Sequence, residues 1–370
     1  MTGPRLTPLA ASLPATVPFV GPETQERDRG AAFRARLGAN ESVFGPSPTA
    51  IAAIRDAAAE AWKYGDAQNH ELRHALARHH GVPAESIVVG GGIDGLLGTL
   101  VRLLVCKGRP VVTSDGTYPT FNYHVAGFGG ALHKVPYCSD AIDLDALAAK
   151  AHETGAGLVY LANPDNPMGG WHSAAAIARL IGALPTGSVL CLDEAYADFA
   201  PEDAIPVLDA HDARVIRMRT FSKAHGLAGA RVGYALGHAD LIAAFERVRN
   251  HFGVTRMGQA GALAALGDRD WLGQVVAQVE AARARLGEIG RANGLVPLPS
   301  ATNFVTMDCR RDGDFARRVV AELGGLGIFV RMPFVAPQDR CIRISVGTST
   351  DLDIVAEALP MALSRAAEQG

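Results

Sequence analysis

One lysine stands out among the residues that can do covalent chemistry. The chain has 370 residues and 35 basic side chains, of which only five are lysines. Lys223 lies in the segment TFSKAHGLAGARVGY at 220–234. An amine that is partly desolvated in a turn readily loses its proton, and a neutral amine forms a Schiff base, which a guanidinium does not. Thr220, Ser222 and Arg231 add two hydroxyl donors and a bidentate cation suited to a phosphate. An ordinary surface lysine in a loop is the alternative.

Two further segments bring polar groups to one edge of the expected sheet. SVLCLDEAYADF (188–199) puts Asp193 at the carboxyl end of a strand, where open α/β sheets bind ligands. A carboxylate there can pair with a protonated pyridine nitrogen, the pairing that makes a pyridoxal ring an electron sink. Tyr196 can hydrogen-bond the ring hydroxyl group, or be an ordinary half-buried aromatic. In LANPDNPMGG (161–170), a strand runs into a turn that holds Asn166 near the same edge.

Alternating strands and helices must position these groups. Near-continuous apolar strands are typical of a parallel sheet that is covered on both faces, so we expect a large α/β domain over 47–250. Residues 1–46, rich in Pro, Gly and Ala, are expected to form an N-terminal arm. The predicted strands are SIVVG (86–90), PVVTS (110–114), GLVYLA (157–162), SVLCLD (188–193), RVIRMR (214–219) and RVGYAL (231–236).

Helix signals lie on both sides of this sheet. Ser47 followed by Pro48 predicts a helix start, and Asn69 and Gly81 predict the two ends of a second helix. After about residue 250 the pattern changes and predicts a smaller C-terminal α+β domain over 251–370. Its predicted elements are helices at 255–266 and 269–293, the strands NFVTMD, GIFVR and CIRISVG, and a final helix from Thr350.

Composition excludes several classes of protein. With 48% hydrophobic and 20% charged residues, the chain can bury a large core, which excludes intrinsic disorder and a small disulfide scaffold. A formal charge of −3 leaves no basic excess for nucleic acid or an anionic membrane. The five cysteines show no CxxC spacing and indicate thiols in a reducing compartment. Pro14 and Pro18 interrupt any signal-peptide segment, so we expect a soluble, cytoplasmic protein.

The segment GGGIDG (90–95) fits the GxGxxG fingerprint of dinucleotide sites, with Asp115 twenty residues beyond Gly95. The motif indicates anion binding more generally, because backbone N–H groups at a helix N-terminus can bind any phosphate. We therefore favour a phosphate site over a nicotinamide site, since nothing downstream supplies partners for hydride transfer.

The segment HELRH fits HExxH, which on a helix can hold zinc through His70 and His74 with Glu71 as a base. A solvated helix face is the favoured interpretation because no third ligand follows by spacing. No metal is predicted, and a zinc hydrolase is kept as a distant alternative.

Together, these segments resemble the fold type I pyridoxal-phosphate enzymes of the class I/II aminotransferases, most closely the histidinol-phosphate aminotransferase branch. They occur in the family's order between residues 37 and 348. The matching segments are LGANES, YGD followed by ELRHALA, GGGIDG, TYPTF, NPDNPMG, DEAYADF, TFSKAHGLAGARVG, GIFVR and CIRISVGT.

The resemblance implies pyridoxal 5'-phosphate as cofactor, with a role for each matching residue. Lys223 binds the cofactor and moves a proton, Asp193 pairs with the pyridine nitrogen, and Asn166 and Tyr196 bind the ring oxygen. Tyr118 stacks on the ring. The implied phosphate ligands are the backbone amides of Gly92 and Ile93 with Thr220, Ser222 and Arg231.

The resemblance also implies a homodimer, in which Tyr64 reaches the phosphate of the neighbouring subunit. Arg343 is expected to bind the substrate carboxylate or an equivalent anion, and Arg331 fits a second anion position or a surface strand end. Phe19 stands where this branch usually has a tyrosine. Because phenylalanine has no hydroxyl, a hydrogen bond to a charged acceptor, worth about 1.5–3 kcal/mol, is lost. Asn166 is also expected at the substrate.

The implied reaction moves an amino group from an amino acid or amino alcohol phosphate to a 2-oxo acid. The change at Phe19 leaves histidinol phosphate, an aromatic amino acid or another amino acid open as donor. A decarboxylase of the threonine-phosphate type shares the same cofactor residues and is the closest alternative. A non-catalytic ligand-binding member of the fold is another.

Overall fold

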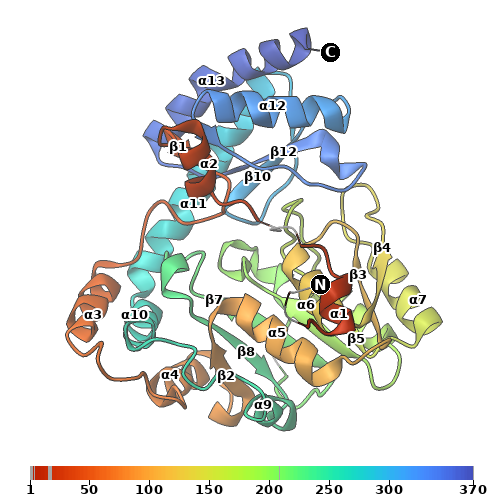
Figure 1. Ribbon diagram of the computed structural model, residues 1–370. Helices are drawn as coiled ribbons and strands as arrows, with labels where there is room; N and C mark the ends of the chain where they lie inside the picture. The colour runs from red at the N-terminus through yellow and green to blue at the C-terminus, as the bar shows by residue number, and fades with distance from the viewer. Residues whose placement is uncertain (1–2, 4, 16–18, 208, 370) are drawn as a thin grey trace.

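A mostly parallel sheet forms the base of the larger lobe (Figure 1). The computed structural model describes residues 3, 5–15, 19–207 and 209–369. Within them, seven strands run in the spatial order β2 (Ile87–Gly90), β8 (Gly233–Gly237), β7 (Val215–Thr220), β6 (Val189–Asp193), β5 (Leu158–Ala162), β3 (Pro110–Ser114) and β4 (Ala131–Val135). Only β8 runs antiparallel to its neighbours in this described sheet. The predicted α/β fold class is confirmed.

Strand β4 was not among the predicted strands. It forms the edge of the sheet next to β3, and its sequence ALHKV carries His133 and Lys134. An edge strand is covered on fewer sides than a central one, so it keeps polar side chains and shows no apolar run.

Helices cover both faces of the sheet, as the buried apolar strands require. One face packs against α5 (Gly92–Leu104), α6 (Pro119–Gly127) and α9 (Ala239–Phe245). The other face packs against α7 (Leu144–Thr154) and α8 (Ala174–Ala183) toward β3, and against α3 (Pro48–Ala58), α4 (His70–His80) and α10 (Arg256–Gly267) toward β2.

The starts of α3 and α4 differ from each other. Ser47 caps α3 as predicted, since its hydroxyl accepts from the amide of Ala50 at 3.1 Å. Asn69 precedes α4 but has a left-handed backbone, φ 50°, and its side chain makes no cap bond. The carboxylate of Asp66 caps the helix instead, accepting from the amide of His70 at 2.6 Å. Capping is a matter of side-chain geometry, which residue type alone does not determine.

The smaller lobe contains a three-stranded antiparallel sheet in the order β12 (Cys341–Ser345), β10 (Phe304–Asp308) and β9 (Val296–Pro297). Three helices pack with it around one hydrophobic core: α11 (Arg269–Ala292), α12 (Gly313–Gly325) and α13 (Ser349–Glu368). Figure 1 shows this lobe above the larger sheet, with α11 running between the two.

The N-terminal segment lies first against the larger lobe, where Leu9 is close to Gly129, and then against the smaller one (Figure 1). Its elements are α1 (Pro8–Ser12), α2 (Pro22–Arg29) and β1 (Ala35–Arg36). Strand β1 pairs in parallel with β11 (Ile328–Phe329), next to α12. Residues 1–2, 4 and 16–18 of the predicted arm lie outside the described residues. The domain limits at 46 and 250 stay predictions.

Among the described residues, no helix combines the length and apolar character that crossing a membrane requires.

Candidate active site

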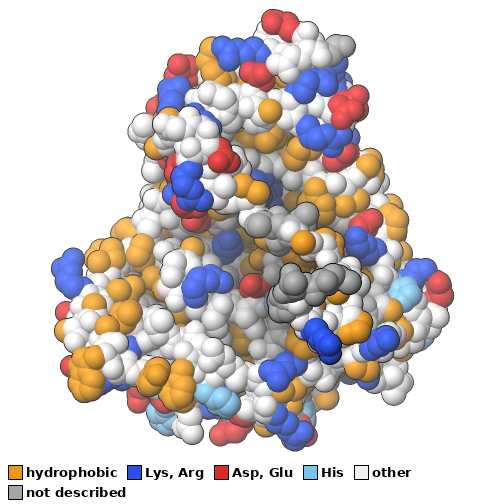
Figure 2. All heavy atoms as spheres, in the orientation of Figure 1, with side chains coloured by type: hydrophobic (Ala, Val, Ile, Leu, Met, Phe, Trp, Pro, Cys, Tyr) orange, Lys and Arg blue, Asp and Glu red, His pale blue; other side chains and the backbone are white. Residues whose placement is uncertain are grey.

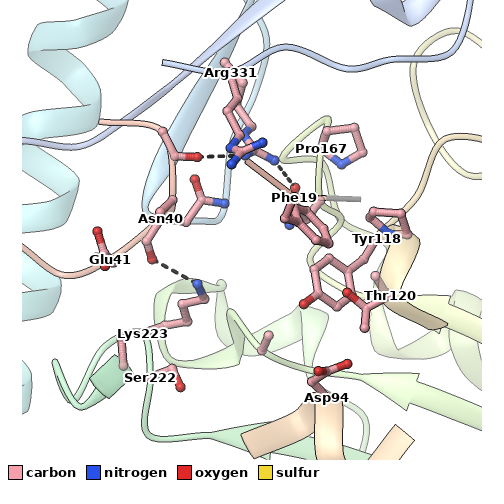
Figure 3. A pocket seen from close by; sticks show the side chains of 18 of the residues that line it. Phe19, Asn40, Glu41, Asp94, Tyr118, Thr120, Pro167, Ser222, Lys223 and Arg331 are labelled. Atoms are coloured by element: carbon pink, nitrogen blue, oxygen red, sulfur yellow. Dashed lines mark hydrogen bonds between the residues drawn. The ribbon is translucent and has the colours of Figure 1, made fainter. Parts of the chain in front are cut away.

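A cavity of about 1040 Å³ lies between the two lobes, at the carboxyl ends of β5, β6 and β7 (Figures 2 and 3). Parallel strands deliver the residues after their carboxyl ends to one edge, which is why distant segments meet there. The cavity brings together most of the predicted site residues: Phe19, Ile93, Tyr118, Asn166, Asp193, Tyr196, Thr220, Ser222, Lys223, Arg231, Arg331 and Arg343.

Lys223 follows β7 and extends its amine into this cavity (Figure 3). Its Nζ donates to the backbone carbonyl oxygen of Asn40 at 3.0 Å and lies 5.7 Å from the ring centroid of Tyr196. Burial, followed by the nearby charge of Arg343, lowers the pKa of Lys223 to about 8. Near neutral pH, the amine is therefore more often uncharged, and thus nucleophilic, than an exposed lysine would be.

Asp193 ends β6 and is only 4% exposed. Its carboxylate accepts from the hydroxyl of Tyr160 at 2.7 Å and from the amide of Ala195 at 3.0 Å, both neutral donors. Burial raises the pKa of Asp193 to about 6. A protonated pyridine nitrogen is the kind of cation that would stabilise this carboxylate.

Tyr160 was missed in the sequence because it lies within the apolar run GLVYLA. A buried tyrosine hydroxyl needs a hydrogen-bond partner, so a tyrosine in an apolar parallel strand is itself a signal.

Asn166 and Tyr196 meet at the side of the cavity nearest the small lobe. The amide nitrogen of Asn166 donates to the hydroxyl of Tyr196 at 3.4 Å, and its oxygen accepts from Arg343. Asn40 donates to the same tyrosine hydroxyl at 3.0 Å. Asn40 lies in the matching segment LGANES, yet the sequence assigned it no role. Its contacts come from segments that are distant in the chain, which no local pattern reveals.

Arg343 lies on β12 and is 9% exposed. One guanidinium nitrogen donates to the carbonyl oxygen of Gly38 at 3.2 Å. Its Nε is buried and finds no hydrogen-bond partner among the residues that the structure describes. A buried cation that lines a cavity suits an anionic ligand group.

A cradle of hydrogen-bond donors forms where α5 begins. Gly92 has φ +79°, and a Cβ there would collide with the guanidinium of Arg231. Arg231 donates to the hydroxyl of Ser222 at 3.3 Å, and the amide of Ser222 donates to the hydroxyl of Thr220 at 3.0 Å. With the amide of Ile93 at the helix N-terminus, these groups are the donors that a phosphate needs.

The fingerprint GGGIDG is therefore not part of a dinucleotide unit. In the described sheet, β2 pairs with β8 in antiparallel fashion and is not a neighbour of β3, so the parallel βαβ unit is not formed. Asp115, which a dinucleotide fingerprint would place at a ribose, forms an ion pair with Lys134 at 3.0 Å.

The outer end of the cavity is aromatic and cationic. Arg331 donates to the carbonyl oxygen of Val20 at 2.8 Å, and its guanidinium carbon lies 5.7 Å from the ring centroid of Phe19. The rings of Phe19 and Tyr123 meet edge to face, with centroids 6.5 Å apart. Arg331 also exchanges backbone hydrogen bonds with Arg343 across an isolated antiparallel bridge, so the two arginines reach the cavity from adjacent segments.

Gly92 does not itself line this cavity, although it contacts Arg231, which does. Two further predicted groups lie outside the cavity. Tyr64 is 77% exposed and packs on Phe252, with ring centroids 4.8 Å apart. In the HELRH segment, Nδ1 of His74 lies 2.9 Å from the carbonyl oxygen of His70, which directs that nitrogen to the helix backbone. Within the described part of the chain, no group of three or more His, Cys, Asp or Glu side chains gathers in a way that could hold a metal.

Comparisons with known proteins agree with this geometry. Residues 35–359 match the family "Aminotransferase class I and II". Histidinol-phosphate aminotransferase 1 of Mesorhizobium japonicum is 35% identical over 337 residues, which cover 89% of this chain and 90% of that protein. The histidinol-phosphate aminotransferase of Gluconacetobacter diazotrophicus is 37% identical over 338 residues, 90% of this chain and 92% of that protein.

Among solved structures, histidinol-phosphate aminotransferase from Sinorhizobium meliloti in complex with pyridoxal-5'-phosphate is 52% identical and has a TM-score of 0.94, covering 98% of each chain. This similarity supports the predicted cofactor and the predicted branch. The family match and the curated relatives favour amino-group transfer over the decarboxylase, zinc hydrolase and nicotinamide alternatives. By its sequence, fold and cavity, this chain belongs to the class I and II aminotransferases.

Proposed function

We propose that this aminotransferase holds pyridoxal 5'-phosphate on Lys223 and moves an amino group from an amino acid or amino alcohol phosphate to a 2-oxo acid, with histidinol phosphate as the first candidate donor. One observation carries the proposal. Lys223 and Asp193 line the same cavity. Lys223 is an amine with a lowered pKa, and Asp193 is a buried carboxylate whose hydrogen-bond partners are neutral.

When bound, the cofactor supplies an electron sink for the bonds at the donor's amino carbon. The residues of this chain do the rest. Asp193 would pair with the protonated pyridine nitrogen, and Asn166 and Tyr196 would donate to the ring oxygen. Tyr118, which lines the cavity, packs on the ring. The Lys223 amine would hold the cofactor and would take up and return a proton at the donor's amino carbon.

The phosphate of the cofactor fits the cradle at the start of α5. The amides of Gly92 and Ile93 point outward from a helix N-terminus, where the helix dipole favours an anion. Arg231 and Ser222 add a charge and a hydroxyl on the opposite side. This cradle would hold the cofactor in place when Lys223 is released for proton transfer.

Arg343 and Arg331 would bind the anionic groups of the substrates. Arg343 is buried beside Asn166 and suits the carboxylate or equivalent anion next to the reacting carbon. Arg331 lies at the outer end, beside Phe19, and suits a second anion at the far end of a substrate. Because Phe19 has no hydroxyl, that outer contact loses one donor, so aromatic amino acids remain candidate donors besides histidinol phosphate.

We also propose a homodimer in which Tyr64 contacts the cofactor phosphate of the partner subunit. Tyr64, Trp62 and Phe252 are large hydrophobic side chains that are more than half exposed. Figure 2 shows hydrophobic side chains gathered on the α3 side of the molecule, where this part of the chain lies. Exposed apolar groups that gather in this way mark interaction surfaces. The cytoplasmic location expected from the sequence stays a prediction.

The function is tested with the cofactor-loaded protein and a panel of amino donors that includes L-histidinol phosphate, L-glutamate and L-phenylalanine. We expect a visible absorption band that a donor bleaches and a 2-oxo acid restores. Reduction with borohydride should leave a pyridoxyl group on Lys223, and Lys223→Ala should keep neither this adduct nor the reaction.

Three results would contradict the proposal. Carbon dioxide released from a donor would indicate a decarboxylase. A bound cofactor that reacts with no donor would indicate a non-catalytic protein. A reduced adduct on a lysine other than Lys223 would refute the assignment of the site.

A further inference from the structure

A second buried carboxylate, Asp165, lies behind the cavity and has no part in the proposed chemistry. It is 4% exposed and accepts hydrogen bonds from three donors, all of them neutral. The hydroxyl of Tyr137 donates at 2.9 Å, the hydroxyl of Thr117 at 3.3 Å and the amide of Met168 at 3.2 Å. Burial raises the pKa of Asp165 to about 6, so ionisation of this carboxyl group costs free energy in the fold. A residue that only fills space would not need such an arrangement.

The donors come from three separate segments, two of which also line the cofactor cavity. Tyr137 follows the edge strand β4, Thr117 lies between β3 and α6, and Met168 lies in the turn after β5. Because all three hydrogen bonds end on one carboxyl group, they fix the segments relative to each other.

Two of these segments carry predicted ring contacts at the adjacent position. Thr117 immediately precedes Tyr118, and Asp165 immediately precedes Asn166. Tyr118 and Asn166 both line the cavity, and Asn166 contacts Tyr196 and Arg343. A displaced Asp165 would therefore move the contacts to the cofactor ring and to the substrate anion together.

We propose that Asp165, held by Tyr137 and Thr117, is a positioning residue that sets Asn166 and Tyr118 on the cofactor and Asn166 on Arg343. The inference rests on the proposed function, because it assigns these groups to the cofactor ring and the substrate. Asp165 touches neither ligand itself and acts through the residues next to it.

The test compares cofactor-loaded wild type with Tyr137→Phe, Thr117→Val, Asp165→Ala and Asp165→Asn. The control is Thr113→Val, since Thr113 is a fully buried threonine of β3 whose hydroxyl makes no hydrogen bond to the described residues. The first readout is the pH midpoint at which the visible absorbance of the bound cofactor changes. The second readout is the pair of values KM and kcat, each determined separately with L-glutamate as donor and 2-oxoglutarate as acceptor.

Tyr137→Phe should move the midpoint upward by about 0.5 pH unit or more, because a ring oxygen that receives poorer hydrogen bonds is the stronger base. It should raise the KM for L-glutamate roughly tenfold through the misplaced Arg343 contact, with a smaller change in kcat. Thr117→Val should act in the same direction. Asp165→Ala should change the midpoint and the KM more than either hydroxyl variant does. Asp165→Asn should stay closer to wild type than Asp165→Ala, because its amide oxygen still accepts hydrogen bonds.

Unchanged midpoint and KM in Tyr137→Phe and Thr117→Val, or equal shifts in Thr113→Val, would overturn the proposal. If Asp165→Ala does not fold, the two hydroxyl variants still decide the question. If the wild type reacts with no donor, the proposed function fails, while the absorbance midpoint still tests the positioning role.

Discussion

The amine of Lys223 donates to the backbone carbonyl oxygen of Asn40 at 3.0 Å, although the two residues are 183 positions apart in the chain. The side chain of Asn40 bonds to Tyr196 in the large lobe and to Ser345 in the small lobe. The chain crossing between the lobes thus contacts the predicted catalytic lysine and the predicted ligand of the ring oxygen at one residue (Figure 3).

Substitution of Asn40 should weaken both the fold and the cofactor site. Asn40→Ala removes the hydrogen bonds to Tyr196 and Ser345, and we expect a loss of about 1–3 kcal/mol in the free energy of unfolding. Asn40 has a left-handed backbone, φ 55°, so Asn40→Gly, which removes the same side chain without backbone strain, should be less destabilised. Urea denaturation of both variants checks this order. Equal stability of Asn40→Ala and wild type would show that these bonds contribute nothing.

The cofactor-free protein should respond to pH through Asp193. Its carboxyl group has a pKa of about 6 in the fold, above the ordinary value of 3.8, so the fold prefers the protonated form. The stabilising contribution of protonated Asp193 to the free energy of unfolding is thus fully present below pH 3.8 and is lost as the pH rises through 6. Asp193→Asn should match wild type at pH 3.5 and exceed its free energy of unfolding by about 3 kcal/mol at pH 8.

Addition of pyridoxal phosphate should reverse this order at pH 8, because the ionised Asp193 then has a pyridinium partner that the amide cannot replace. Thermal denaturation of both proteins, with and without cofactor, measures the difference. If the difference in stability between cofactor-free wild type and Asp193→Asn does not vary with pH, burial of the charged carboxylate costs no free energy.

The phosphate cradle should tolerate no side chain at Gly92. Gly92→Ala would place a methyl group against the guanidinium of Arg231 and strain a backbone with φ +79°. We expect the dissociation constant for pyridoxal phosphate to rise roughly tenfold or more, which corresponds to at least about 1.4 kcal/mol. Gly95→Ala in the same helix is the matched control, since no atom lies within 4 Å of the position that its methyl group would occupy. Absorbance titration of the cofactor-free proteins would refute the cradle if both variants bound alike.

The proposed dimer should dissociate when charge is placed on its apolar surface. Trp62 is 79% exposed, and Trp62→Glu would bury a carboxylate if this surface is covered by a partner subunit. Val296→Glu, at an exposed apolar position of β9 in the small lobe, controls for the added charge. Sedimentation velocity should give a dimer for wild type and the control, and a monomer for Trp62→Glu. A monomeric wild type would contradict the dimer.

Local sequence patterns identified site residues where the residue type itself limits the chemistry that is possible. The only lysine after position 150, the carboxylate after an apolar strand and the turn NPDNPMG all lie at the cavity. Parallel strands explain this success, because each delivers the residue after its carboxyl end to the same edge. The HExxH and GxGxxG patterns were ambiguous for the opposite reason, since a short motif does not specify its neighbours in space.

Contacts between distant segments were beyond any local pattern. Asn40, Tyr160 and Asp165 each contact at least one partner that is 28 to 305 positions away in the chain. Strand β4 and the Asp66 cap were missed because an edge strand needs no apolar run and a cap depends on where a side chain points.

The sequence by itself therefore determined the chemical groups and their order along the chain, since amine, carboxylate and guanidinium are properties of residue types. Only the tertiary structure decided which groups share a low-dielectric cavity, and with it the pKa values of Lys223 and Asp193. Those values depend on burial and on neighbouring charges. Burial and charge are properties of the packed molecule and not of any single segment.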